Sequence, residues 1–252
     1  MEHAEIAGLD LELEIVGETS GSRGSLLFLA PEYFRAQHAT FVAALAARWR
    51  VVAPVHPGFD GRPPPPNFRT VGDLAYLYLD LIDGLDVPVS VLGASLGGWI
   101  ALEMAVRSTR RIEALTLIAP LGVKFGGREE REYADVFAVD DAEALSWMFA
   151  QAPPDLSSFN DDALTQVAVD RQYLAYYAWK PYLHQPGLDR WLHRIDVPTT
   201  LIWGAEDGLV PPAMGERLSS ALPDARLEVI PGAAHYPQLE SPEAVLTAAG
   251  LT

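Results

Sequence analysis

The sequence predicts a three-layer α/β sandwich in which a mostly parallel sheet of about eight strands lies between two layers of helices. Short apolar runs alternate with stretches of helical periodicity through the first half of the chain. Several of these runs, such as 25–30, are apolar on both faces, as strands covered on both sides in a parallel sheet must be. The 252 residues suit one such domain with an insertion.

The composition excludes several classes of partner. Apolar residues make up 49% and charged residues 21% of the chain, as in ordinary globular proteins. The net charge of −16 disfavours nucleic acid, anionic membranes and strongly anionic substrates. The absence of cysteine excludes disulfides, thiolate metal sites and a cysteine nucleophile. With no signal peptide and no apolar run approaching roughly 18 residues, we expect a cytoplasmic protein, and the sequence leaves a homo-oligomer open.

The first half reads as alternating strands and helices. Residues 9–16 alternate apolar with acidic side chains, which predicts a half-exposed antiparallel strand near a sheet edge. Apolar runs at 25–30, 50–54 and 112–119 predict buried strands. Helical spacing of apolar residues predicts helices over 41–49 and 71–85. Strands and helices in this order favour a parallel sheet with right-handed crossovers.

The alternation stops after residue 121. Residues 122–196 are helical and aromatic, with helices predicted at 142–150 and 163–179. Strand signals resume at 197–203 and 227–230. We therefore predict a core formed by residues 1–121 and 197–252, with residues 122–196 inserted as a helical cap.

The stretch around Ser95 predicts a nucleophile. Gly93-Ala94-Ser95-Leu96-Gly97 has the G-x-S-x-G layout, between a β-branched run and an amphipathic helix. This layout makes a tight turn that strains the serine backbone and exposes its hydroxyl, and it needs small neighbours. The free N–H of Leu96, at the start of the helix, can bind a negative oxygen beside the serine.

At these residues the chain resembles the α/β-hydrolase fold superfamily, and the resemblance extends from the N-terminal strands to the last helix. It implies a serine hydrolase with a helical cap, similar to esterases and to hydrolases of meta-cleavage products. In such proteins the acid and then the histidine follow the serine along the chain. Relatives with an aspartate nucleophile, such as dehalogenases and epoxide hydrolases, are excluded by Ser95.

A serine hydroxyl needs a base, and the base needs an orienting carboxylate. His235 ends a small-residue loop after the strand at 227–230, where open α/β sheets place their sites, and the loop resembles the histidine loop of α/β-hydrolases. His56 is the main rival because it also follows a strand. The remaining histidines are expected in surface or packing roles: His3 and His38 on the surface, and His184 and His193 in the cap.

Two adjacent acidic residues follow the buried strand at 197–203. Asp207 matches the acid in the G-x-x-D-x-x-V-P pattern of similar hydrolases, so we predict that it orients His235. Glu206 is the alternative. Ser95, Asp207 and His235 form the predicted catalytic triad.

The predicted oxyanion hole consists of the backbone N–H groups of Leu96 and Glu32. Similar enzymes carry His-Gly before the second donor, whereas this chain has Ala30-Pro31. Proline has no N–H, so the backbone of Glu32 is the donor that remains in register. Its carboxylate would disfavour an oxyanion unless the side chain points away.

Aromatic residues are dense in the predicted cap, and Tyr173, Tyr176 and Tyr177 form one helical stripe. The stripe could serve only to pack the helix, but we expect part of it to face the cleft. The residues predicted to contact the substrate are Tyr33, Trp147, Tyr176, Trp179 and Tyr236.

These observations predict a serine hydrolase of small, fairly apolar esters, or of diketones cleaved at a carbon–carbon bond. No metal or organic cofactor is implied. The altered oxyanion loop favours, as the alternative, a binding or receptor-like protein on the same fold. A lyase or a cofactor-independent oxygenase on the same scaffold is a third class.

Overall fold

The computed structural model describes residues 1–18, 23–85, 87–127 and 129–252. Its described strands form one eight-stranded sheet in the order β1-β2-β4-β3-β5-β6-β7-β8. The strands are β1 (Glu2–Ile6), β2 (Leu9–Val16), β3 (Ser25–Leu29), β4 (Arg50–Pro54), β5 (Val89–Ala94), β6 (Ile112–Ile118), β7 (Thr199–Gly204) and β8 (Ala225–Ile230). Only the pairs β1-β2 and β2-β4 are antiparallel. The predicted mostly parallel sheet is therefore confirmed.

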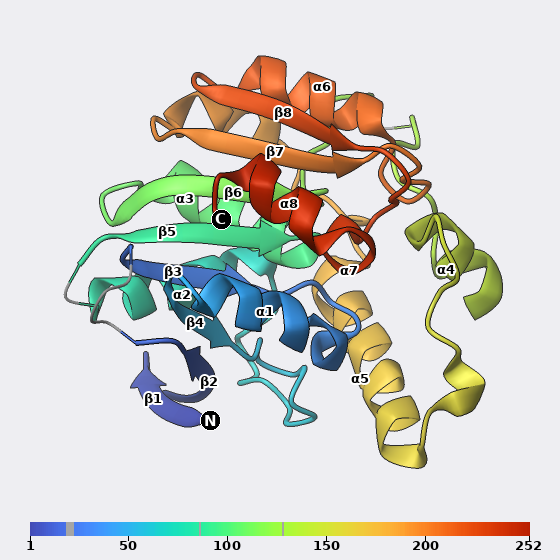
Figure 1. The fold of residues 1–252 in the computed structure, drawn as a ribbon, viewed down its shortest axis with the longest axis horizontal. Coiled ribbons are helices and arrows are strands. Elements are labelled where there is room, and N and C mark those ends of the chain that lie inside the picture. The colour runs from blue at the N-terminus through green and yellow to red at the C-terminus, as the bar shows by residue number, and fades with distance from the viewer. Residues whose placement is uncertain (19–22, 86, 128) are drawn as a thin grey trace.

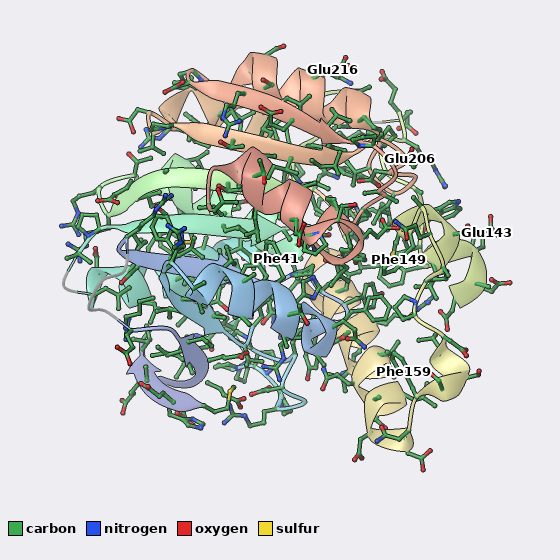
Figure 2. All side chains as sticks on the ribbon, in the orientation of Figure 1. Phe41, Glu143, Phe149, Phe159, Glu206 and Glu216 are labelled. Atoms are coloured by element: carbon green, nitrogen blue, oxygen red, sulfur yellow. The ribbon has the colours of Figure 1, made fainter. Side chains whose placement is uncertain are left out.

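Helices cover both faces of this sheet (Figure 1). The α-helices are α1 (Ala39–Ala46), α2 (Val71–Asp83), α3 (Leu96–Arg107), α4 (Asp141–Met148), α5 (Asp161–Ala178), α6 (Pro212–Ala221), α7 (Pro237–Glu240) and α8 (Pro242–Ala249), and the 3-10 helices are η1 (Arg35–His38), η2 (Leu156–Ser158) and η3 (Leu188–Arg194). Helices α1 and α8 bury their apolar residues in one cluster, to which Phe41, labelled in Figure 2, belongs. Helices α2, α3 and α6 contribute to the cluster on the other face. The three-layer arrangement is confirmed.

Strand β5 and helix α3 occupy the centre of the molecule. β5 lies between β3 and β6 in the sheet, and α3 contacts β3, β5, β6, α2 and η3. Every residue of α3 except Arg107 is buried. The turn between β5 and α3 is therefore held on all sides by the core, which makes it a rigid place for a reactive side chain.

The chain between β6 and β7 forms α4, η2, α5 and η3. Figure 1 shows α4 and α5 beyond the carboxyl ends of β5, β7 and β8, where the strand arrows point. Figure 2 shows Glu143 on the side of this segment that faces away from the sheet, whereas Phe159 packs against the core cluster. The division into a core and a cap remains a prediction.

One strand was missed by the sequence analysis. β2 has the predicted bounds, but β1 pairs outside it and forms the sheet edge. The two strands are joined by Ala7 and Gly8, both with positive φ (52° and 76°), as a two-residue hairpin turn requires. β1 has only five residues, and both of its acidic residues are exposed. Its alternation of polar and apolar residues is therefore too short to predict a strand without knowledge of the pairing with β2.

The packing of α3 against β3 generates a prediction about Gly97. A Cβ atom on Gly97 would lie 2.0 Å from the carbonyl oxygen of Leu29, which is backbone and cannot rotate away. We expect Gly97→Ala to reduce the free energy of unfolding by about 1 to 3 kcal/mol. Urea unfolding monitored by circular dichroism measures this.

Gly84→Ala is the matched control, because a Cβ there would lie 3.4 Å from Leu81 O and 3.8 Å from Asp80 O, and φ is −77°. It should be neutral or stabilise the protein by less than about 1 kcal/mol. Equal unfolding midpoints for the two variants would contradict the steric argument.

Candidate active site

Ser95 sits on a strained turn between β5 and α3. Its backbone has φ 49° and ψ −114°, and its N–H donates to Ile118 O across 2.9 Å. The positive φ turns the side chain out of the strand-to-helix path, as the G-x-S-x-G layout predicts. Gly93 is required at the same place, because a Cβ on it would lie 2.4 Å from Gly97 O.

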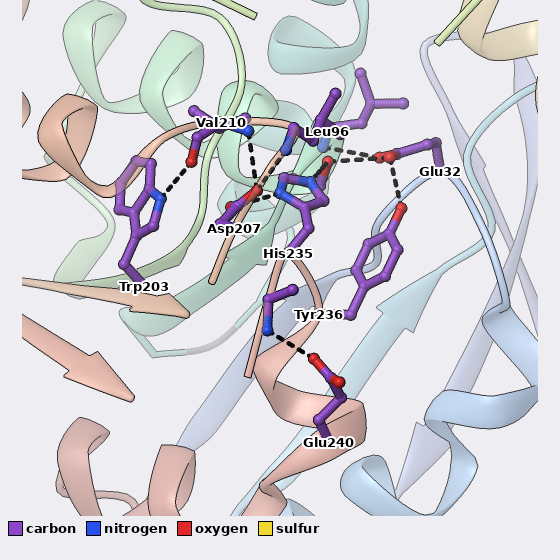
Figure 3. Close-up of polar contacts among 11 residues, drawn as sticks. Glu32, Leu96, Trp203, Asp207, Val210, His235, Tyr236 and Glu240 are labelled. Carbon is purple, nitrogen blue, oxygen red and sulfur yellow. Dashed lines mark hydrogen bonds and ion pairs between the residues drawn. The ribbon is translucent and has the colours of Figure 1, made fainter. Parts of the chain in front are cut away.

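The structure brings the three predicted triad residues together (Figure 3). His235 Nε2 lies 2.8 Å from Ser95 Oγ, and His235 Nδ1 lies 2.8 Å from Asp207 Oδ2. Their exposed fractions are only 1% for Ser95 and His235 and 4% for Asp207. Three side chains from loops after β5, β7 and β8 thus form one buried hydrogen-bonded chain.

The loop after β7 holds Asp207 in place. Asp207 Oδ1 accepts hydrogen bonds from the N–H groups of Leu209 and Val210, each across 2.9 Å. Trp203 Nε1 then donates to Val210 O across 2.8 Å (Figure 3). Glu206, the alternative acid, is exposed and instead accepts from Gly232 N across 3.3 Å. The geometry therefore favours Asp207 over Glu206 as the partner of His235.

Glu240 fixes the loop that carries His235. Its Oε2 accepts from Ala234 N across 2.7 Å, and its Oε1 accepts from Ala150 N and Gln151 N across 2.9 and 2.8 Å. The N–H of His235 itself donates to Met148 O across 3.0 Å. The histidine loop is thus tied to the chain just after α4. The sequence analysis did not find Glu240, since its partners are backbone groups with no sequence signal.

His235 is poised to hold a proton. Burial disfavours the charged imidazole, but the nearby carboxylates of Asp207 and Glu32 outweigh burial and raise the pKa of His235. When His235 is neutral, its Nδ1–H donates to Asp207 and its Nε2 accepts a hydrogen bond from the Ser95 hydroxyl. When His235 is protonated, Nε2–H donates to Ser95 Oγ, and the serine hydroxyl can turn to Glu32.

The Glu32 side chain points into the predicted oxyanion position, which is the orientation in which its carboxylate would disfavour an oxyanion. Glu32 Oε2 accepts from Leu96 N across 3.2 Å, and Oε1 accepts from Ser95 Oγ across 3.1 Å and from Tyr236 OH across 2.8 Å. Glu32 is 2% exposed. A buried carboxylate needs donors, and the start of α3 together with Tyr236 supplies them. The Leu96 N–H therefore faces the site as predicted, but it already donates its hydrogen bond to the Glu32 carboxylate.

His56 supports the loop before Glu32 rather than the triad. His56 Nε2 lies 3.0 Å from Ala30 O, which only accepts, so Nε2 carries the proton and Nδ1 accepts from Tyr78 OH across 2.6 Å. Burial lowers the pKa of His56 to about 4, so it stays neutral. His56 thus holds the carbonyl of Ala30, which with Pro31 stands in place of the His-Gly pair of similar enzymes.

The surface role predicted for His38 is wrong. It is 1% exposed, and its Nδ1 lies 2.8 Å from Phe34 O. Its Nε2 accepts from Gln238 Nε2 across 3.0 Å. Local sequence patterns do not indicate that α7 covers the 3-10 turn on which His38 lies.

The residues predicted to contact substrate fall into two groups. Tyr33 and Tyr236 are buried next to the site, and Trp147 contributes its carbonyl, which accepts from Gly208 N across 2.9 Å. Tyr176 and Trp179 are 42% and 54% exposed, and Tyr176 OH donates to Phe68 O across 2.9 Å. This placement does not favour substrate contact for these two, because they lie on the outer side of the stripe, while Tyr173 and Tyr177 are its buried members.

An apolar cavity of about 230 Å³ adjoins the loop after Glu32. It lies between α4 and α5, and its wall includes Tyr33, Phe34, Leu145, Met148 and Val167, with Asp141 and Arg171 also lining it. Phe34 also packs edge-on against Phe149 and Tyr236, which links this cavity to the residue beside His235. The cavity can hold a small apolar group close to the site.

The described residues contain neither a candidate metal site nor a helix that could span a membrane. No three His, Asp or Glu side chains in residues 1–18, 23–85, 87–127 and 129–252 are grouped so that they could hold a metal ion. No helix in the same residues is long and apolar enough to cross a bilayer.

Comparison with known proteins matches residues 20–248 to the model of the alpha/beta hydrolase family. A pimeloyl-[acyl-carrier protein] methyl ester esterase from Neisseria meningitidis is 30% identical over 226 residues, covering 79% of this chain and 81% of the relative. Such relatives support a hydrolase.

Solved structures show the same fold. The naproxen esterase of Bacillus subtilis has a TM-score of 0.77 at 19% identity, over 99% of this chain and 89% of its own. A meta-cleavage product hydrolase from Pseudomonas fluorescens has a TM-score of 0.75 at 20% identity, over 99% and 96%. At this identity the likeness concerns the fold alone.

The contacts of Glu240 generate a stability prediction. Glu240→Ala leaves three backbone N–H groups without their acceptor, so we expect the free energy of unfolding to fall by about 1.5 to 3 kcal/mol. Glu216→Ala removes the same charge from the exposed side of α6, as Figure 2 shows, and should change it by less than about 0.5 kcal/mol. Differential scanning calorimetry compares the two, and equal losses would show that charge alone matters.

Proposed function

This chain belongs to the alpha/beta hydrolase family, and from that premise we propose that it is a serine hydrolase of small, fairly apolar carboxylic esters. The observation that carries the proposal is the chain of two 2.8 Å contacts from Ser95 through His235 to Asp207. A serine becomes a nucleophile when such a base and orienting acid adjoin it.

In the acylation step, Ser95 Oγ forms a bond to the ester carbonyl carbon while its proton passes to His235 Nε2. Asp207 keeps the Nδ1 proton in place and stabilises the imidazolium. The carbonyl oxygen becomes an oxyanion that accepts from Leu96 N–H once Glu32 has left that donor. The bond to the leaving alcohol oxygen then breaks, and His235 returns its proton to that oxygen.

In the deacylation step, water attacks the acyl carbon and gives one proton to His235. The bond between Ser95 Oγ and the acyl carbon breaks, and His235 returns the proton to Ser95. The product is a carboxylic acid, which releases its own proton to solvent. The enzyme is restored with no cofactor consumed.

The substrate class is inferred from the surroundings of the site. The adjoining apolar cavity suits a short acyl or alkyl group, and the net charge of −16 disfavours strongly anionic substrates. The methyl ester esterase relative supports ester chemistry. Residues 122–196 would act as the cap, because α4 and α5 line the cavity. A panel of p-nitrophenyl esters of increasing acyl length, run beside a dienedione, distinguishes ester from carbon–carbon hydrolysis.

A binding protein that has lost efficient turnover is the second candidate. The observation that favours it is the Glu32 carboxylate in the oxyanion position. A fluorophosphonate probe separates the two, because only an activated serine reacts with it.

We expect Ser95→Ala to abolish fluorophosphonate labelling and ester hydrolysis while the melting temperature stays the same or rises. The substitution removes the nucleophile and two hydrogen bonds, but leaves no buried donor without an acceptor. Labelling followed by gel fluorescence and the ester assay measure both effects. Retention of more than a few per cent of the activity would exclude Ser95 as the nucleophile.

The raised pKa of His235 generates a pH prediction. Hydrolysis needs neutral His235, so kcat/KM should rise with pH through a midpoint above the ordinary histidine value of about 6.5. Removing the charge of Glu32 lowers that pKa, so Glu32→Gln should move the midpoint to lower pH. Initial rates from pH 5 to 9 measure the shift. A midpoint that stays in place or moves upward would contradict the electrostatic argument.

A further inference from the structure

The Glu32 carboxylate lies where the proposed reaction would place a negatively charged oxygen (Figure 3). The Leu96 N–H that would hold the oxyanion already donates to Glu32 Oε2 across 3.2 Å. The hydroxyl that would attack the substrate lies 3.1 Å from Glu32 Oε1. The side chain and the oxyanion therefore need the same donor.

The surroundings of Glu32 form a binding site for a carboxylate. Leu96 N–H donates to Oε2 and Tyr236 O–H donates to Oε1, and Ser95 O–H can also donate to Oε1 when His235 is protonated, so both carboxylate oxygens act as acceptors. The site lies at the N-terminus of the 12-residue helix α3, which also favours an anion. These donors form a site that binds a carboxylate, and in this structure the Glu32 side chain occupies it.

We propose that Glu32 is an internal competitor for the oxyanion position: an ester carbonyl has to displace it, and it displaces the carboxylate product after turnover. This inference rests on the proposed function, because the product is a carboxylate only if Ser95 hydrolyses acyl compounds. It assigns to Glu32 the control of substrate entry and product release, not a step in bond making.

Tethering makes this competition effective. A product carboxylate has the same charge and the same acceptor atoms as Glu32, but it must come from solution. A group held on the same chain acts at an effective concentration of about millimolar or higher. Free product at lower concentration is therefore excluded. The same competition weakens substrate binding, because only molecules whose oxyanion position is free can bind the ester. The apparent dissociation constant equals the intrinsic one divided by the fraction of such molecules.

Two other observations agree with this role. Ser95 and Glu32 are only 1% and 2% exposed, so the carboxylate is held against the serine inside the protein and not at its surface. Asp170 of α5 is 3% exposed, and burial together with the charge of Glu32 raises its pKa to about 7. Because the charge of Glu32 disfavours a second negative charge at Asp170, it also disfavours a product carboxylate close by, which favours product release.

Emptying the position with Glu32→Ala tests the proposal. We expect acetate to raise the melting temperature of this variant by several degrees in a saturable way, because acetate then fills the vacated site. Acetate should also slow its labelling by a fluorophosphonate. Sodium chloride at equal concentration controls for ionic strength.

Wild type and Glu32→Gln are the matched controls. Glutamine keeps the volume of the side chain, so neither protein should respond to acetate more than to chloride. Without acetate, Glu32→Ala should label about tenfold faster than wild type, since its oxyanion position is free. Adding Tyr236→Phe to Glu32→Ala removes one donor and should weaken acetate binding about threefold to tenfold. If Glu32→Ala does not fold, Glu32→Ser takes its place.

The outcomes separate this inference from the proposed function. An acetate-insensitive Glu32→Ala that still labels would overturn the inference and leave the hydrolase proposal standing. Loss of labelling in both Glu32→Ala and Glu32→Gln, with labelled wild type, would also overturn it, since Glu32 would then be needed for the reaction. Acetate stabilisation without labelling of any protein would reject the hydrolase proposal and leave the carboxylate site in place.

Discussion

The close contact between the start of α3 and the end of β3 is the constraint on which the site depends. Because Gly97 has no side chain, α3 approaches the carbonyl of Leu29 so closely that no Cβ atom would fit between them. This approach sets the sharp turn at Ser95 and brings the first N–H of α3 beside the loop that follows β3. Glu32 on that loop can then reach Leu96 N. The strain at the serine and the occupied oxyanion position thus have one steric origin.

The electrostatics of the site follow from two carboxylates on opposite sides of one imidazole. Asp207 is held by backbone N–H groups and reaches Nδ1, while Glu32 is held by Leu96 and Tyr236 beside the serine. Both favour the imidazolium form of His235. The imidazolium that forms when His235 takes the Ser95 proton would therefore be stabilised from both sides.

Local sequence signals were enough to find Ser95, Asp207 and His235. Each of them follows an apolar strand and lies among small or turn-forming residues, so the parallel sheet alone places the three at one edge. The direction of the Glu32 side chain could not be predicted, because it depends on Tyr236, which is 204 residues away along the chain. Glu240 was missed for a different reason, since its partners are backbone N–H groups that leave no mark in the sequence.

The attachment of α4 to the catalytic loops uses main-chain atoms on the α4 side. The carbonyls of Trp147 and Met148 accept from Gly208 and His235, and the N–H groups of Ala150 and Gln151 donate to Glu240. Backbone contacts of this kind do not depend on which side chains the segment carries. The chain between β6 and β7 can therefore change its sequence, and with it the wall of the cavity, without disturbing the positions of Asp207 and His235. A chimera that exchanges this segment with that of another hydrolase should keep its triad in register if residues 147–151 retain their backbone path.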